Sequence, residues 1–175
     1  GGVRFTRELV VPKREQVIAL HLKADQPGAL SFLATLARPA QVSTRRNGET
    51  YVMEGQLTFD WPGQQGVRYQ ALLGATRRGG KITSTDEGLR IEAADEVTLL
   101  VSAGTDMHDK DFTTTVAKRL TDARTQEFSS MRDAAAADHK SYVDRCRLTL
   151  PRTDAAKLPT PERVKLAQKT ADPAL

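Results

Sequence analysis

The sequence predicts a mainly β fold: an antiparallel β-sandwich followed by a helical linker. Up to about residue 105, apolar and polar residues alternate in short runs, and turn-forming residues separate these runs. After this point the apolar spacing becomes helical. No helical pattern lies between the alternating runs, which argues against βαβ units and a parallel sheet.

Each predicted strand is a run in which alternate residues fall on one face. In residues 51–59, for example, Tyr51, Met53, Leu57 and Phe59 share a face. Residues 97–101 are apolar nearly throughout, which is typical of a strand covered on both faces. The predicted strands are residues 3–9, 16–23, 51–59, 68–76, 89–93 and 97–101. The turns between strands are residues 25–28 (DQPG), 47–48 (NG), 61–63 (WPG), 79–80 (GG) and 86–88 (DEG).

Two helices are predicted after the strands. Phe112, Val116 and Leu120 recur every four residues and predict a short helix. A longer stripe predicts a second helix in which Cys146 is a small buried residue. This stripe consists of Phe128, Met131, Ala135, Tyr142 and Cys146.

The last part of the chain is more polar. Residues 147–150 alternate and predict a short strand that ends at Pro151. Thr160 can cap a final helix, with Pro161 at its first position. We therefore divide the chain into a sandwich at residues 1–105, a helical linker with a returning short strand at 106–150, and a polar connection with a first helix at 151–175.

Composition limits the classes of partner. Lys and Arg total 26 and Asp and Glu 22, and the two signs are interspersed, so we expect no nucleic-acid partner. No apolar run approaches the roughly 18 residues that span a bilayer, so we expect no membrane partner. The single Cys146 excludes an intrachain disulfide and a multi-cysteine zinc site. No phosphate-binding loop, nucleophile elbow or cofactor motif is present, and we expect no cofactor.

The densest polar cluster is residues 106–111 (DMHDKD). Asp106, His108, Asp109 and Asp111 are candidate ligands for a divalent cation. The alternative is a solvated turn in which Asp111 or a following threonine caps the helix that begins at Phe112.

A sugar could stack on Trp61, which lies at a predicted hairpin tip and is the candidate substrate-binding residue. The tyrosines Tyr51 and Tyr69 are better explained by sheet packing. No motif selects the pair of carboxylates that glycoside hydrolysis uses, so no catalytic residue is predicted. We expect Asp95 and Glu96 to serve a turn.

Three further polar residues have structural explanations. Glu8 is expected to pair with a neighbouring strand. His21 and His139 are each interpreted as a hydrogen-bonded interface residue rather than a base or ligand.

Segments taken in order resemble glycoside hydrolase family 95, the α-L-fucosidases. The first resembles that family's "GVRYTRE" strand, and the others resemble its next strand and turn, its "ADeVtLLl" strand, its linker junction and the "LPTdeRl" and "DPaL" segments before its barrel. In this chain they are residues 2–9 (GVRFTREL), 16–32 (QVIALHLKADQPGALSF), 94–100 (ADEVTLL), 139–145 (HKSYVDR), 158–163 (LPTPER) and 172–175 (DPAL). Residues 105–109 depart from the family pattern, which often has a serine-aromatic stretch there.

This resemblance implies the later part of an N-terminal β-sandwich, an incomplete supersandwich, and a linker toward a catalytic α/α barrel. The implied parent reaction is inverting hydrolysis of terminal α-L-fucosyl linkages in oligosaccharides or glycans. The family's catalytic residues would lie beyond Leu175, so no role transfers to a position in this chain. The implied partners are the barrel domain and, through the parent enzyme, a fucosylated glycan, with a periplasmic or extracellular location.

Two function classes follow from these observations. The first is the non-catalytic N-terminal portion of a bacterial fucosidase, which braces the barrel. The alternative is an independent carbohydrate-binding β-sandwich that contacts a sugar ring through Trp61. A basic nucleic-acid binder would rest on the sequence pI of about 9.4 alone, and the interspersed charges disfavour it.

Overall fold

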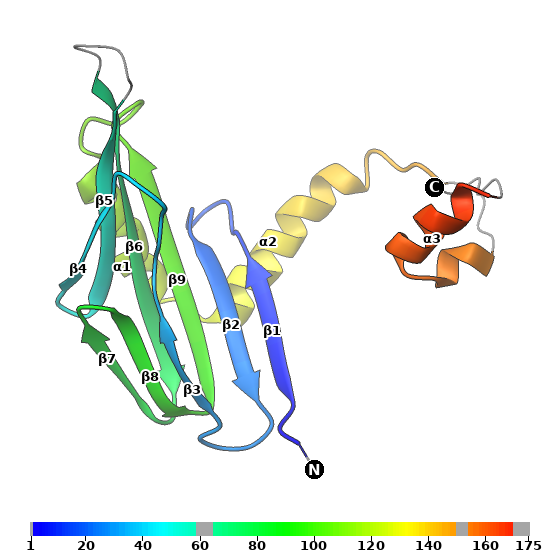
Figure 1. The fold of residues 1–175 in the computed structure, drawn as a ribbon, viewed down its shortest axis with the longest axis horizontal. Helices are drawn as coiled ribbons and strands as arrows, with labels where there is room; N and C mark the ends of the chain where they lie inside the picture. Colours follow the sequence, from blue (N-terminus) through cyan, green and yellow to red (C-terminus); the bar gives the residue numbers. More distant parts are fainter. Residues whose placement is uncertain (1, 59–64, 150–153, 170–175) are drawn as a thin grey trace. The chain divides into compact units, whose positions relative to one another are not determined.

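A computed structural model describes residues 2–58, 65–149 and 154–169. It confirms the predicted mainly antiparallel β architecture, with two sheets followed by helices (Figure 1). The chain divides into two compact units, Gly1–Asp138 and His139–Leu175, which are described separately below.

The first unit contains a six-stranded and a three-stranded antiparallel sheet. In the larger sheet the strand order is β1-β2-β9-β6-β5-β4, and in the smaller sheet it is β3-β8-β7. The larger sheet consists of β1 (Phe5–Val10), β2 (Ile18–Ala24), β9 (Glu96–Thr105), β6 (Gln65–Arg78), β5 (Thr50–Thr58) and β4 (Ser43–Asn47). The smaller sheet consists of β3 (Leu30–Ala34), β8 (Gly88–Ala94) and β7 (Lys81–Thr85).

The larger sheet forms the middle of three layers, because each of its faces packs against a separate apolar cluster (Figure 1). On one face, Leu73 and Val97 pack with Leu89 and Ile91 of the smaller sheet. On the other face, Leu72 and Leu100 pack against helices α1 (Phe112–Arg124) and α2 (Phe128–Val143). Alternate residues of β9 thus reach two cores, as its nearly continuous apolar sequence predicts.

Two glycines allow α1 to approach the larger sheet closely. A Cβ atom at Gly104 would lie 2.7 Å from Cγ2 of Val116, and one at Gly74 would lie 3.2 Å from Cδ2 of Leu120. Both side chains on the helix are almost fully buried. The missing side chains on the strands therefore make the space that α1 occupies.

All six strands predicted within residues 1–105 are present, but β3, β4 and β7 were missed. Each of the three is only 5 residues long. Every residue of β4, STRRN, is exposed, so its sequence lacks the apolar alternation that marks a half-buried strand. β4 is held instead by its pairing with β5.

The helix that follows the sheets has the predicted buried stripe. Phe112, Val116 and Leu120 are all buried on α1, and Ala123 continues the stripe. Asp111 stands at the N-cap position, but its side chain makes no capping hydrogen bond. Its carboxylate instead accepts a 2.9 Å hydrogen bond from the hydroxyl of Thr114.

The predicted stripe on α2 is buried only over its first turn. Phe128 and Met131 are buried, whereas Tyr142 is 54% exposed. The prediction that Cys146 is buried is wrong, because α2 ends at Val143 and the thiol is exposed. The helical spacing of apolar residues therefore continues in the sequence beyond the last residue of α2 that is buried, Met131.

The short strand predicted at residues 147–150 is also wrong for residues 147–149, which have no regular secondary structure. No strand in the described chain pairs with them, and the side chain of Leu148 is 83% exposed. Leu150 lies outside the described residues. Alternation in three residues cannot make a strand without a partner edge.

The second unit contains short helices. A 3₁₀ helix covers Asp154–Lys157, and α3 covers Thr160–Ala167. Thr160 is the first helical residue rather than the cap, since Pro159 holds the N-cap position, while Glu162 lies in the first turn as expected. None of the helices in the described ranges is long and apolar enough to cross a membrane.

Candidate functional site

Two rows of polar side chains cross the larger sheet on its helix-facing side. Residues paired across antiparallel strands share a face, so each row contains one residue from each of four neighbouring strands, β1, β2, β9 and β6. The first row is Thr6, Lys23, Glu96 and Arg78. The second row is Glu8, His21, Thr98 and Thr76. We call these eight residues the polar rows.

The next row along the same face is apolar and lies under the helices. It contains Val10, Ala19, Leu100 and Gly74, and the first three belong to the core that α1 and α2 cover. The sheet face therefore changes from apolar to polar where the cover by the helices ends. This pattern leaves the polar rows beside the connection between α1 and α2.

Charges in the first row are paired. Glu96 accepts contacts from Lys23 at 2.8 Å and from Arg78 at 2.7 Å. The hydrogen bond from Lys23 and the neighbouring guanidinium of Arg78 hold the pKa of Glu96 below its ordinary value. This carboxylate stays ionised at neutral pH and joins three strands.

His21 is the central group of the second row. Its Nδ1 atom lies 3.0 Å from the hydroxyl of Thr98, and its ring stacks on Phe128 with centroids 4.7 Å apart and planes 15° apart. Burial lowers the pKa of His21, which favours the neutral imidazole. The interpretation of His21 as a hydrogen-bonded interface residue is confirmed.

Glu8, at the outer end of the second row, contacts Arg132 of α2 at 3.9 Å. The expected pairing of Glu8 with a neighbouring strand is confirmed, because the register sets Glu8 opposite His21 of β2, and the contact with Arg132 adds a partner on a helix. Together, His21 and Glu8 connect the sheet to the first half of α2.

A polar hollow of about 410 Å³ lies where the rows meet the helix connection. Its floor includes His21, Thr76 and Thr98, and its wall is formed by residues 124–128. Residues 76–78 and 96–98 complete the lining. We refer to this cavity as the polar hollow.

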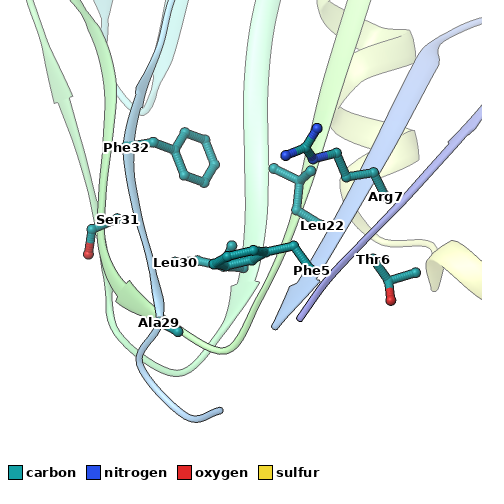
Figure 2. Close-up of a pocket in the computed structure, with 8 residues that line it drawn as sticks. All are labelled: Phe5, Thr6, Arg7, Leu22, Ala29, Leu30, Ser31 and Phe32. Carbon is teal, nitrogen blue, oxygen red and sulfur yellow. The ribbon is translucent and has the colours of Figure 1, made fainter. Parts of the chain in front are cut away.

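A second depression, of about 310 Å³, is apolar and opens at the edge of the sandwich (Figure 2). Phe5 and Leu22 line it from the larger sheet, and Leu30 and Phe32 line it from β3. Figure 2 shows these four side chains gathered between the sheets, while Ser31 points away from them. The depression offers packing surface but few groups for chemistry.

The candidate metal ligands at residues 106–111 have other partners. Asp106 forms a 2.9 Å ion pair with Arg68, and Asp109 accepts hydrogen bonds from the Asp111 amide at 2.9 Å and the Thr115 hydroxyl at 2.6 Å. Within the described residues, no group of three or more His, Cys, Asp or Glu side chains is placed to hold a metal ion. His108 thus joins no such group with the three carboxylates.

The other predicted residues have separate positions. Asp95 accepts a 2.7 Å hydrogen bond from the Gly28 amide, which confirms its role in a turn. The same expectation for Glu96 is wrong, because Glu96 is the first residue of β9 and pairs with Lys23 and Arg78 on neighbouring strands. Tyr51 is buried in the core between the sheets. Trp61 lies outside the described residues, so its contact with a sugar ring stays a prediction.

Sequence reasoning missed Thr76, Arg78 and Gln126 as members of one cavity. These residues come from β6 and the α1–α2 connection, about fifty positions apart in the chain. Polar residues at alternate positions near the end of a strand indicate a solvated face. Only the strand register shows which of these strand ends lie next to one another and form a cavity.

The fold is thus that of a two-sheet antiparallel sandwich carrying a helical layer on the outer face of its larger sheet. Residues 1–110 match the family model described as glycosyl hydrolase family 65, N-terminal domain. The chain therefore belongs to the family of glycosyl hydrolase family 65 N-terminal domains. A comparison with curated proteins finds no match. The resemblance to a glycoside hydrolase N-terminal domain is confirmed, while the family shown is 65 rather than 95.

Proposed function

We propose that this chain is the non-catalytic N-terminal portion of a glycoside hydrolase and braces a catalytic α/α barrel domain. The observation that carries the proposal is the match of residues 1–110 to an N-terminal domain of this enzyme class. In this proposal residues 1–105 form the bracing sandwich, residues 106–150 are the linker, and residues 151–175 lead toward the barrel.

Three carboxylates among the described residues have properties that support a non-catalytic role. A glycosidase general acid needs a pKa raised toward neutrality. The carboxyl groups of Glu54, Glu96 and Asp106 instead have lowered pKa values, because Gln70, Lys23 and Arg68 respectively donate hydrogen bonds to them. Each is an ionised structural partner, which is the opposite of what an acid catalyst requires.

The same proposal extends to the parent reaction, inverting hydrolysis of terminal α-L-fucosyl linkages. Its support is the order of the six sequence segments that resemble the family 95 α-L-fucosidases, from residues 2–9 to residues 172–175. A fucosylated oligosaccharide or glycan would then be the substrate of the parent enzyme, bound at the barrel. The match to a family 65 domain is compatible with any glycosidase parent and leaves this choice to experiment.

The non-catalytic role is tested with the 175-residue chain and aryl α-L-fucosides and α-D-glucosides. We expect no release of the aryl group above the blank rate, because the general acid and the water-activating residues belong to the barrel. Turnover that co-purifies with the folded chain would overturn the proposal.

The parent reaction is tested by sequencing the gene on both sides of these residues and assaying the encoded protein. We expect an α/α barrel after residue 175 and hydrolysis of the α-L-fucoside with inversion at the anomeric carbon. A barrel enzyme that cleaves only other glycosides would remove the fucosidase assignment and leave the bracing role in place. An open reading frame with no barrel would remove both.

A further inference from the structure

We propose that the polar hollow is a binding site for a neutral saccharide on the sandwich domain itself. This inference goes beyond the bracing role, since it assigns carbohydrate contact to residues outside any catalytic domain. It does not involve Trp61 and rests on the size of the cavity, its free hydrogen-bonding groups, its charge balance and its ring surface.

The size of the hollow suits a small polar ligand. Its volume of about 410 Å³ falls within the range of roughly 300–1,000 Å³ that small-molecule sites occupy. The floor is formed by paired β-strands and the wall by the short connection between two packed helices. Groups on such elements are held in place before a ligand arrives, which lowers the entropic cost of binding.

Several polar groups in the hollow are available to a ligand. In the part of the chain that the structure describes, no hydrogen bond or ion pair engages the Thr76 hydroxyl or the Glu127 carboxylate. The second ring nitrogen of His21 is also uncommitted there, since the bond to Thr98 uses Nδ1. These groups provide both donors and acceptors, as a polyhydroxylated ligand requires.

The charges of the lining favour a neutral ligand over an anion. Arg78 is already paired with Glu96 at 2.7 Å, and Arg124 with Glu49 at 3.0 Å. An incoming anion would compete with these pairs and would also meet the carboxylate of Glu127.

A cationic ligand is disfavoured in the same way. It would compete with Arg78 for the carboxylate of Glu96 and would meet the guanidinium groups of Arg78 and Arg124, which line the hollow. Hydroxyl groups, in contrast, can hydrogen-bond to paired arginines and carboxylates without displacing their partners.

Ring and methyl surface adds the apolar component that a sugar uses. The stacked rings of His21 and Phe128 and the threonines Thr76 and Thr98 all line the hollow. A pyranose has apolar C–H faces as well as hydroxyl groups, so a mixed lining matches it better than a purely polar one.

The binding experiment uses amide NMR spectra of the isotopically labelled 175-residue chain. The probes are two neutral sugars, methyl α-L-fucopyranoside and maltose, with glucuronate as an anionic and glucosamine as a cationic control. We expect a neutral sugar to shift amide signals of residues 76–78, 96–98 and 124–128, with millimolar affinity and weaker effects from the charged sugars. Shifts confined to other regions, including residues 59–64, would overturn the site, as would the absence of shifts with every probe. A preference for glucuronate or glucosamine would overturn the neutral ligand class.

Matched threonine variants test the contact itself. Thr76→Val removes the free hydroxyl from the floor while keeping the side-chain shape, and we expect it to weaken binding about three- to tenfold. Thr44→Val removes a threonine hydroxyl from the exposed β4 and should bind like the parent. Equal affinities for the two variants would contradict the proposal.

A second variant tests the site in case Thr76→Val disturbs the folding of the sheet. Gln126→Ala changes an exposed side chain in the helix connection, where the core is not affected. We expect it to weaken binding with the amide spectrum otherwise preserved. Parent-like binding by a folded Gln126→Ala together with a folded Thr76→Val would overturn the assignment of the hollow. The bracing role would survive that result, because it is tested by turnover and by the gene sequence.

Discussion

Helices α1 and α2 have similar apolar spacing in the sequence, but they differ in how much of that stripe is buried. On α1 the four stripe positions are all buried, namely Phe112, Val116, Leu120 and Ala123. On α2 only Phe128 and Met131 are buried, and the later stripe positions Tyr142 and Cys146 are exposed.

The difference arises from the surface opposite each helix. Gly74 and Gly104 have no side chain, which leaves room for Leu120 and Val116 of α1, respectively. The first turn of α2 packs on the same core and on His21, and among the described residues no stripe position of α2 after Met131 belongs to this core. Helical periodicity thus predicts that a helix forms, whereas burial depends on strands far away in the sequence.

The largest effect on stability should come from truncating the α1 stripe. Leu120→Ala removes a side chain that is 2% exposed, and we expect a loss of about 2–5 kcal/mol in the free energy of unfolding. Leu148→Ala, which follows α2 and is 83% exposed in the parent, should change it by less than about 0.5 kcal/mol. Urea denaturation of both variants measures the contrast. Similar losses at the two leucines would mean that the segment after α2 packs against other side chains.

A smaller effect should follow from adding a methyl group to the sheet at the point where α1 approaches it. Gly104→Ala places a Cβ atom 2.7 Å from Cγ2 of Val116, and we expect a loss of about 1–3 kcal/mol in the free energy of unfolding. The second substitution Val116→Ala should recover part of this loss, because it removes the clashing methyl group. The double-mutant cycle measures the coupling. Additive losses would show that α1 does not approach the sheet as closely as the structure indicates.

These contrasts show which parts of the structure a sequence can predict. The strands with clear alternation and both helices were predicted, since the signal for each lies within one segment. The short strands β3, β4 and β7 were missed because pairing with neighbours, rather than their own pattern, holds them in the sheets. The polar hollow could not be predicted, because His21, Thr98 and Thr76 become one row only through the register of β2, β9 and β6.

The contact between His21 and the first turn of α2 should make stability depend on pH. Burial, Lys23 and Arg132 lower the pKa of His21, and they outweigh Glu96 and Glu8, which raise it. The unfolded chain therefore binds the proton more readily than the folded one. The free energy of unfolding should fall as the pH drops below about 6.5 and through the folded-state pKa, with no contribution from His21 above this range.

The measurement compares urea denaturation of the parent and His21→Gln between about pH 7.5 and pH 5.5. We expect the parent to lose more stability over this range than the variant, which has no imidazole to protonate. His139→Gln changes an exposed histidine of α2 and should keep the pH dependence of the parent. If His21→Gln keeps it too, the contact between His21 and Phe128 is not the origin of the effect.

The smallest effect on stability should come from the far end of the α2 stripe. Cys146 is exposed and lies three residues after the end of α2, so Cys146→Ser should change the free energy of unfolding by less than about 0.5 kcal/mol. The parent thiol should also react with Ellman's reagent in the folded protein about as fast as in urea, because no packed side chains shield it. Labelling that requires unfolding would show that the stripe continues into a buried interface. That result would extend the buried part of the α2 stripe as far as Cys146 and make α2 a packed helix like α1.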